Sequence, residues 1–86
     1  MALVKLRAPL KDLAGGRSEV RLQGASLTEV LRALEREHPR TAGWVLDERG
    51  GIRPHVGVFV NGERTKEDVP VGPDDRLYVL PSISGG

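Results

Sequence analysis

The residues with the clearest chemical potential stand at the carboxyl end, where Gly85 and Gly86 follow Ser82, Ile83 and Ser84. Two residues without a Cβ can enter a channel that is too narrow for side chains. What such an end offers to an enzyme is the α-carboxylate of Gly86. We therefore expect Gly86 to be the working group, a carboxylate that another protein activates and loads.

The alternative interpretation is an inert end. Glycine accounts for 11 of the 86 residues, and short glycine-ended tails are often unstructured. The choice between the two depends on whether the rest of the chain forms a domain that presents residues 82–86.

Other candidates for chemistry are weak. His38 and His55 have no metal-ligating companion at short spacing, and the absence of cysteine excludes disulfides, thiolate metal sites and cysteine nucleophiles. The adjacent carboxylates at 67–68 and 74–75 fall in predicted loops. We expect no bound metal or cofactor and no catalysis by the chain itself.

The composition of the chain limits the classes of partner that the protein is expected to bind. The 13 basic and 12 acidic residues are well mixed and give a net charge of +1, and only three residues are aromatic. These totals argue against nucleic acid as the main partner, because neither a basic excess nor a stacking platform is evident. No long apolar run or signal peptide is evident, so we expect a cytoplasmic protein without a membrane partner.

The pattern of apolar residues predicts one main helix among several strands. Ser26 and Glu29 form a capping box, and Leu27, Val30 and Leu31 begin an apolar stripe with helical spacing that should end before Pro39. The strands are expected at 2–7, 18–23, 55–60, 63–65 and 76–80. Residues 8–17 are expected to be a loop, and 41–51 a short helix or turn in which Trp44 packs at the edge of the core.

Strand alternation assigns the two faces of the sheet. Val56, Val58 and Val60 should face the helix, as should Leu77 and Val79. The side chains of the opposite face then form an exposed apolar patch at the root of the tail, and such a patch usually marks a partner surface. Its members are Phe59, Tyr78 and Leu80.

The element order predicts the α+β class and a β-grasp fold of the ubiquitin-like type, in which one main helix crosses one face of a mixed sheet of four to five strands. The first and last strands should be central neighbours. We expect a single domain over residues 1–81 and a flexible tail over 82–86, because Pro81 cannot donate to a strand ladder and should end regular pairing.

The runs Val58–Gly62 and Pro73–Gly86 resemble the ubiquitin-like sulfur carriers. These include the small subunit of molybdopterin synthase, the thiamine-pathway sulfur carrier and the carrier that supplies cysteine synthesis. The resemblance is specific in residues 54–86 and extends to the amino-terminal half only in pattern.

The resemblance implies a mechanism and three partners. An adenylyltransferase similar to ubiquitin-activating enzymes would use ATP to adenylylate Gly86, and a sulfur donor would then displace AMP to give a thiocarboxylate. An acceptor synthase would receive the tail, with Pro81 at its root, and take the sulfur.

The single proline before the tail is more similar to the cysteine-synthesis carrier than to the molybdopterin subunit. The pathway, the sulfur donor and the oligomeric state stay open. Two other functions also stay open: a protein modifier that is joined through Gly86 to target lysines, and a plain interaction domain.

Overall fold

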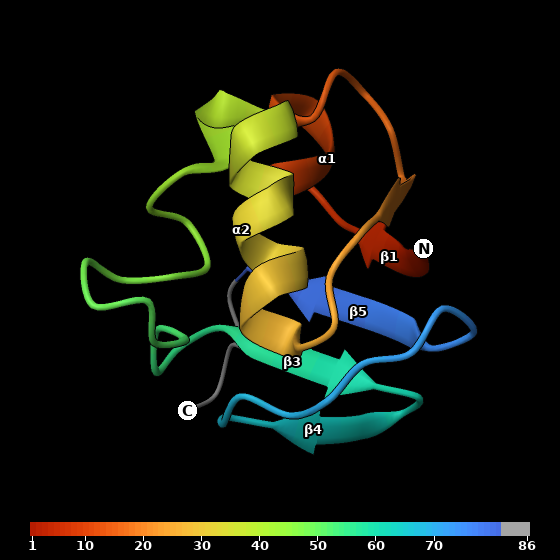
Figure 1. The fold of residues 1–86 in the computed structure, drawn as a ribbon. Coiled ribbons are helices and arrows are strands. Elements are labelled where there is room, and N and C mark those ends of the chain that lie inside the picture. The colour runs from red at the N-terminus through yellow and green to blue at the C-terminus, as the bar shows by residue number, and fades with distance from the viewer. Residues whose placement is uncertain (82–86) are drawn as a thin grey trace.

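Five strands form one mixed sheet, and a long helix lies across one of its faces (Figure 1). The computed structural model describes residues 1–81. The elements in chain order are β1 (Ala2–Leu6), α1 (Leu10–Leu13), β2 (Glu19–Leu22), α2 (Leu27–Glu37), a 3₁₀ turn (Pro39–Thr41), β3 (Gly57–Val60), β4 (Glu63–Thr65) and β5 (Arg76–Leu80). None of the helices within residues 1–81 has the length and apolar character needed to cross a membrane.

The sheet order is β2-β1-β5-β3-β4. β1 pairs antiparallel with β2 and parallel with β5, while β3 pairs antiparallel with both β5 and β4. The first and last strands are therefore central neighbours, as the sequence predicted. A mixed sheet of five strands under one main helix confirms the predicted α+β class and β-grasp architecture.

The core lies between the sheet and α2. Alternate strand residues point toward the helix, and the apolar stripe of α2 packs against them. Full burial of one such aliphatic side chain stabilises the fold by about 1.5–3 kcal/mol. The fully buried members include Val4, Leu22, Leu27, Val30, Leu31, Leu34, Val58, Leu77 and Val79.

The predicted capping box is present at the start of α2. The Ser26 Oγ accepts a hydrogen bond from the Glu29 N–H at 3.3 Å, and the Glu29 carboxylate accepts one from the Ala25 N–H, one residue before the cap, also at 3.3 Å. A second cap comes from far along the chain, because Asp68 Oδ1 accepts a hydrogen bond from the Thr28 N–H at 2.8 Å. The helix ends at Glu37, as Pro39 predicts.

The Asn61-Gly62 turn joins β3 to β4 with positive φ angles of 50° and 88°, the conformation that this residue pair favours in tight hairpins. The Asn61 side chain also fixes the hairpin to the start of β5. Its Nδ2 donates to Asp75 Oδ1 at 2.9 Å, and its Oδ1 accepts from the Arg76 N–H at 3.0 Å.

Several sequence expectations were wrong. The segment 8–17 is not wholly a loop, because it contains α1, which buries Leu10 completely. A four-residue helix is too short to show a periodic pattern. β3 begins at Gly57, whereas position 55 was predicted. Val60 does pack against the core as expected, although it is only half-buried.

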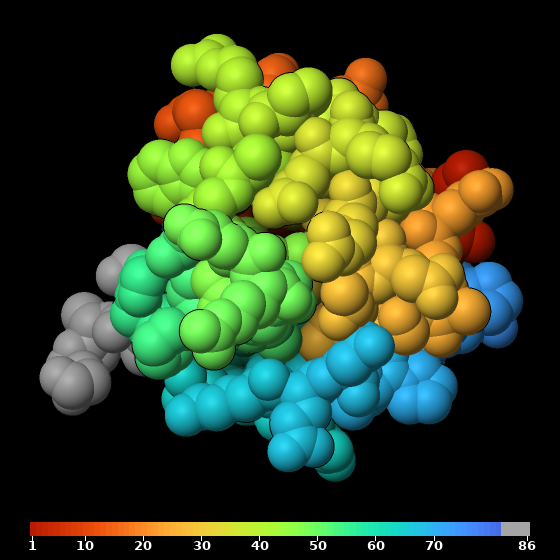
Figure 2. Space-filling view, turned by 60° about the vertical axis from the view of Figure 1, so that its left-hand side comes forward, coloured from red at the N-terminus to blue at the C-terminus, as the bar shows by residue number. Residues whose placement is uncertain are grey.

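The prediction that Trp44 packs at the core edge was also wrong. Val45 and Leu46 are buried, but Trp44 remains 40% exposed. Its segment, residues 42–56, lies beside α2 (green against yellow in Figure 2) and is attached to it where the Gly43 N–H donates to Glu35 Oε2 at 3.4 Å. The buried positions of this loop are taken by the two aliphatic neighbours.

Candidate functional site

The last strand, β5, divides its side chains between the core and the opposite, open face of the sheet. Leu77 and Val79 are buried under α2, whereas Tyr78 and Leu80 are half-buried on the open face. The face assignment made from the sequence is therefore confirmed for this strand.

Pairing with β3 brings the predicted patch together. Phe59 stands directly opposite Tyr78, and Gly57 stands opposite Leu80, so no side chain of β3 covers Leu80. The three residues line a shallow, mainly apolar groove of about 390 Å³. The other lining residues are Lys5, Arg7, Gly62, Arg76 and Leu77.

The groove lies where the domain leads into the predicted tail. β5 ends at Leu80, and Pro81, at the root of the tail, is buried immediately after it. Ser82, Ile83, Ser84, Gly85 and Gly86 lie outside the described residues. The structure therefore places the root of the tail next to the apolar patch and leaves the assignments at 82–86 as predictions.

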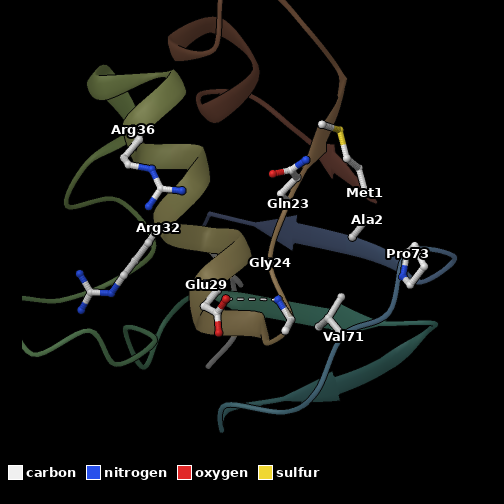
Figure 3. Close-up of a pocket in the computed structure, with 10 residues that line it drawn as sticks. Met1, Ala2, Gln23, Gly24, Glu29, Arg32, Arg36, Val71 and Pro73 are labelled. Atoms are coloured by element: carbon white, nitrogen blue, oxygen red, sulfur yellow. Dashed lines mark hydrogen bonds between the residues drawn. The ribbon is translucent and has the colours of Figure 1, made fainter.

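A larger hollow of about 560 Å³ lies at the amino-terminal half of α2 (Figure 3). Its charged groups do not converge. The Glu29 carboxylate is bound to the Ala25 N–H, and Arg32 extends away from the hollow toward Gly50 on the other side of the helix. This arrangement serves helix capping and loop packing, and it assembles no reactive set.

Three carboxyl groups have pKa values below the ordinary 3.8, and in each case backbone N–H groups are the main cause. The N–H groups of Gly51 and Arg49 lower the pKa of Asp47, and that of Thr28 lowers the pKa of Asp68. The Gly72 N–H and then the Asn61 side chain lower the pKa of Asp75. Through these hydrogen bonds the three carboxylates stabilise two loops and the start of α2.

The part of the chain that the structure describes holds no group of three or more side chains that could bind a metal ion. His55 is exposed at the surface, and His38 is the residue that follows α2, where its carbonyl accepts from the Thr41 hydroxyl at 2.8 Å. What the described residues offer is a rigid domain with one apolar groove beside the end of its central strand.

The sequence matches the model of the ThiS family over residues 4–86. The chain belongs to this family of ubiquitin-like sulfur carriers. The family match covers nearly the whole chain, including the tail, so the resemblance seen in residues 54–86 is confirmed and extends to the amino-terminal half. No curated protein matches the chain.

Solved structures agree with the family assignment. SAMP1 from Haloferax volcanii is 32% identical, with a TM-score of 0.79 over 99% of this chain and 98% of that one. A chain of the Amycolatopsis orientalis BexX/CysO complex is 26% identical, with a TM-score of 0.82 and full coverage of both chains. CysO from Mycobacterium tuberculosis, 21% identical over 96% of this chain and all of that one, shares the fold with a TM-score of 0.86.

Proposed function

We propose that the protein carries sulfur on the carboxylate of Gly86. The observation that carries this proposal is membership of the ThiS family through a match that extends to residue 86. The domain supports it, because the end of central strand β5 and the apolar groove lie together, where a partner holding the groove would also receive the tail.

The chemistry requires activation by a partner. A carboxylate resists attack by nucleophiles, so an adenylyltransferase of the ubiquitin-activating type transfers AMP from ATP to a Gly86 oxygen and releases pyrophosphate. Hydrosulfide supplied by the donor then attacks the acyl carbon, the acyl–oxygen bond to AMP breaks so that AMP leaves, and loss of the sulfur-bound proton gives a thiocarboxylate. Gly85 and Gly86 have no Cβ and so leave this carbon open to attack.

The protein is then a co-substrate, and the groove residues Phe59, Tyr78 and Leu80 bind its partners while residues 82–86 reach the active site. ATP is consumed by the activating enzyme, and the carrier itself binds no cofactor. A biosynthetic synthase accepts the sulfur. Cysteine synthesis is the favoured pathway, with molybdopterin next, and the similarity to a chain of the BexX/CysO complex supports a partner enzyme of a sulfur-transfer system.

The test is the intact mass of the carrier after incubation with ATP, sulfide and the adenylyltransferase of this type encoded in the same genome. We expect a gain equal to the replacement of one oxygen by sulfur. The variant that lacks Gly86 should show no gain and should unfold at the same temperature, since the core is built from residues 2–79. Normal loading of the deletion would refute the assignment of Gly86.

A protein modifier is the second candidate. It is favoured by the 30% identity to a structure described as the small archaeal modifier protein 1 of H. volcanii. In that function an amine of a target lysine attacks the same activated carbon. Blotting of lysates separates the two functions, because a ladder of heavier adducts that disappears without Gly86 indicates conjugation.

A further inference from the structure

The open face of the sheet, turned away from α2, is strongly cationic. Alternation and register place four basic side chains on its strands, and a fifth, Arg7, lines the groove beside them. Glu19 is the acidic side chain that the five strands place on this face. The basic residues are Lys5, Arg7, Arg21, Arg64 and Arg76.

The near-neutral total charge therefore conceals a division. The chain has 13 basic and 12 acidic residues, of which five basic and one acidic lie on this face or line its groove. The remaining surface carries eight basic and eleven acidic residues. The face thus has a formal charge of +4 and the rest of the molecule −3, which together give the net charge of +1.

The cations surround the apolar groove. One row across the sheet runs from Lys5 through Tyr78 and Phe59 to Arg64, with the aromatic pair in the middle and a cation at each side. Arg7 and Arg76 line the same groove. Only Lys5 has an acidic neighbour within ion-pair distance among the described residues, with 3.8 Å between its Nζ and Glu19 Oε2.

We propose that this face docks on an acidic protein surface with an apolar centre, and that this surface belongs to the enzyme that adenylylates Gly86. The inference rests on the proposed function and adds the chemistry of the partner. An apolar centre with a charged rim is the usual anatomy of a protein interface. Nucleic acid fits less well, because phosphate binding would leave the aromatic centre and Glu19 facing a polyanion.

Charge division has a kinetic consequence. Complementary potentials raise association rates by about 10- to 1000-fold at low ionic strength. Because the rest of the molecule carries a formal charge of −3, an acidic partner attracts the groove face more strongly than any other part of the surface. The encounter is then oriented with the root of the tail toward the enzyme before any contact forms.

The experiment measures kcat/KM for ATP-dependent adenylylation of the carrier by the adenylyltransferase encoded in the same genome, as a function of NaCl. Wild-type kcat/KM should fall as salt rises, because added salt screens exposed charges. The paired reversal Arg64→Glu with Arg76→Glu should lower kcat/KM by about 10-fold or more at low salt through KM, with kcat retained. The difference should shrink at high salt.

A matched control changes the net charge by the same amount elsewhere. Arg36→Glu with Arg40→Glu lies on the exposed surface of α2 and of the 3₁₀ turn, outside the face, and should leave kcat/KM within about two-fold, because most of the field at the groove comes from its own rim. Should the face variant unfold, the milder pair Arg64→Gln with Arg76→Gln and the wild-type salt series decide the question.

Equal losses in the face and control pairs, or a wild-type kcat/KM that does not change with salt, would overturn the proposal while leaving sulfur carriage intact. Self-association or RNA binding that the face reversals abolish, with adenylylation unchanged, would also overturn it. Absence of any wild-type adenylylation by a competent enzyme would instead contradict the proposed function.

Discussion

At the scale of single residues, β3 places neighbours in opposite surroundings. Phe59 is half-buried on the open face against Tyr78, and Val58, one position earlier, is fully buried under α2. Neighbouring residues of one strand can therefore separate a role in binding from a role in folding.

We expect Phe59→Asp to weaken binding to the activating enzyme at least 10-fold while lowering the free energy of unfolding by about 1 kcal/mol. Val58→Asp should lower it by more than ~3 kcal/mol, because it buries a charge without a partner. Titration calorimetry and urea denaturation measure the two effects. A similar loss of stability in both variants would show that the face assignment is wrong.

Carboxylates that accept hydrogen bonds from backbone N–H groups should make the stability of the fold depend on pH in the acid range. The folded-state pKa of Asp68 lies below the ordinary 3.8 because the Thr28 N–H stabilises its ionised form. The stability that it contributes is therefore complete above about pH 4 and is lost as the pH falls through the folded-state pKa. Asp47 and Asp75 act in the same direction.

We expect Asp68→Asn to lower the free energy of unfolding at pH 7 and to flatten its decline below about pH 4. Urea denaturation between pH 7 and pH 2 measures both effects. Asp74→Asn is the control, since its side chain accepts none of the hydrogen bonds found within residues 1–81. An unchanged acid profile in Asp68→Asn would contradict the capping role.

At the scale of elements, the connection between β2 and α2 depends on a close approach. A Cβ built on Gly24 would lie 2.7 Å from the Val30 backbone nitrogen and 2.8 Å from its Cγ2. We expect Gly24→Ala to lower the free energy of unfolding by about 1–3 kcal/mol, because the added methyl group forces the helix away from the sheet edge. Gly72→Ala is the control, since its nearest neighbour would be 3.8 Å away. Equal thermal stability of the two variants would disprove this constraint.

The elements that the sequence predicted well are those with local signals. Ser26 and Glu29 mark the start of α2, and Asn61-Gly62 marks the β3–β4 turn, so no distant contact is needed to recognise either. The exposure of Trp44 and the presence of α1 were not predicted, because both depend on tertiary packing and not on local sequence. The second cap on α2 was missed for the same reason, since Asp68 is 40 residues away from Thr28.

The candidate site was predictable in part. Alternation alone placed Phe59, Tyr78 and Leu80 on one face, and the pairing of β3 with β5 joined them into a groove. The cationic rim was not recognised, because its residues are mixed with acidic ones along the chain. Recognition required the strand order, which brings Lys5 of the first strand beside Tyr78 of the last.

At the scale of the whole molecule, the parallel pairing of β1 and β5 determines where the chain ends relative to the sheet. It places the last strand at the centre of the sheet, so that the chain leaves from a braced position next to the groove. In the proposed function the domain acts as a rigid carrier with a recognition face, and the reaction takes place at Gly86.

The most direct test of this account locates the sulfur. The carrier is incubated with ATP, sulfide and the activating enzyme, digested, and its carboxyl-terminal peptide is weighed. The account predicts that the replacement of one oxygen by sulfur maps to Gly86 and requires ATP. A carrier that an active enzyme leaves unmodified, or sulfur found on any other residue, would contradict it.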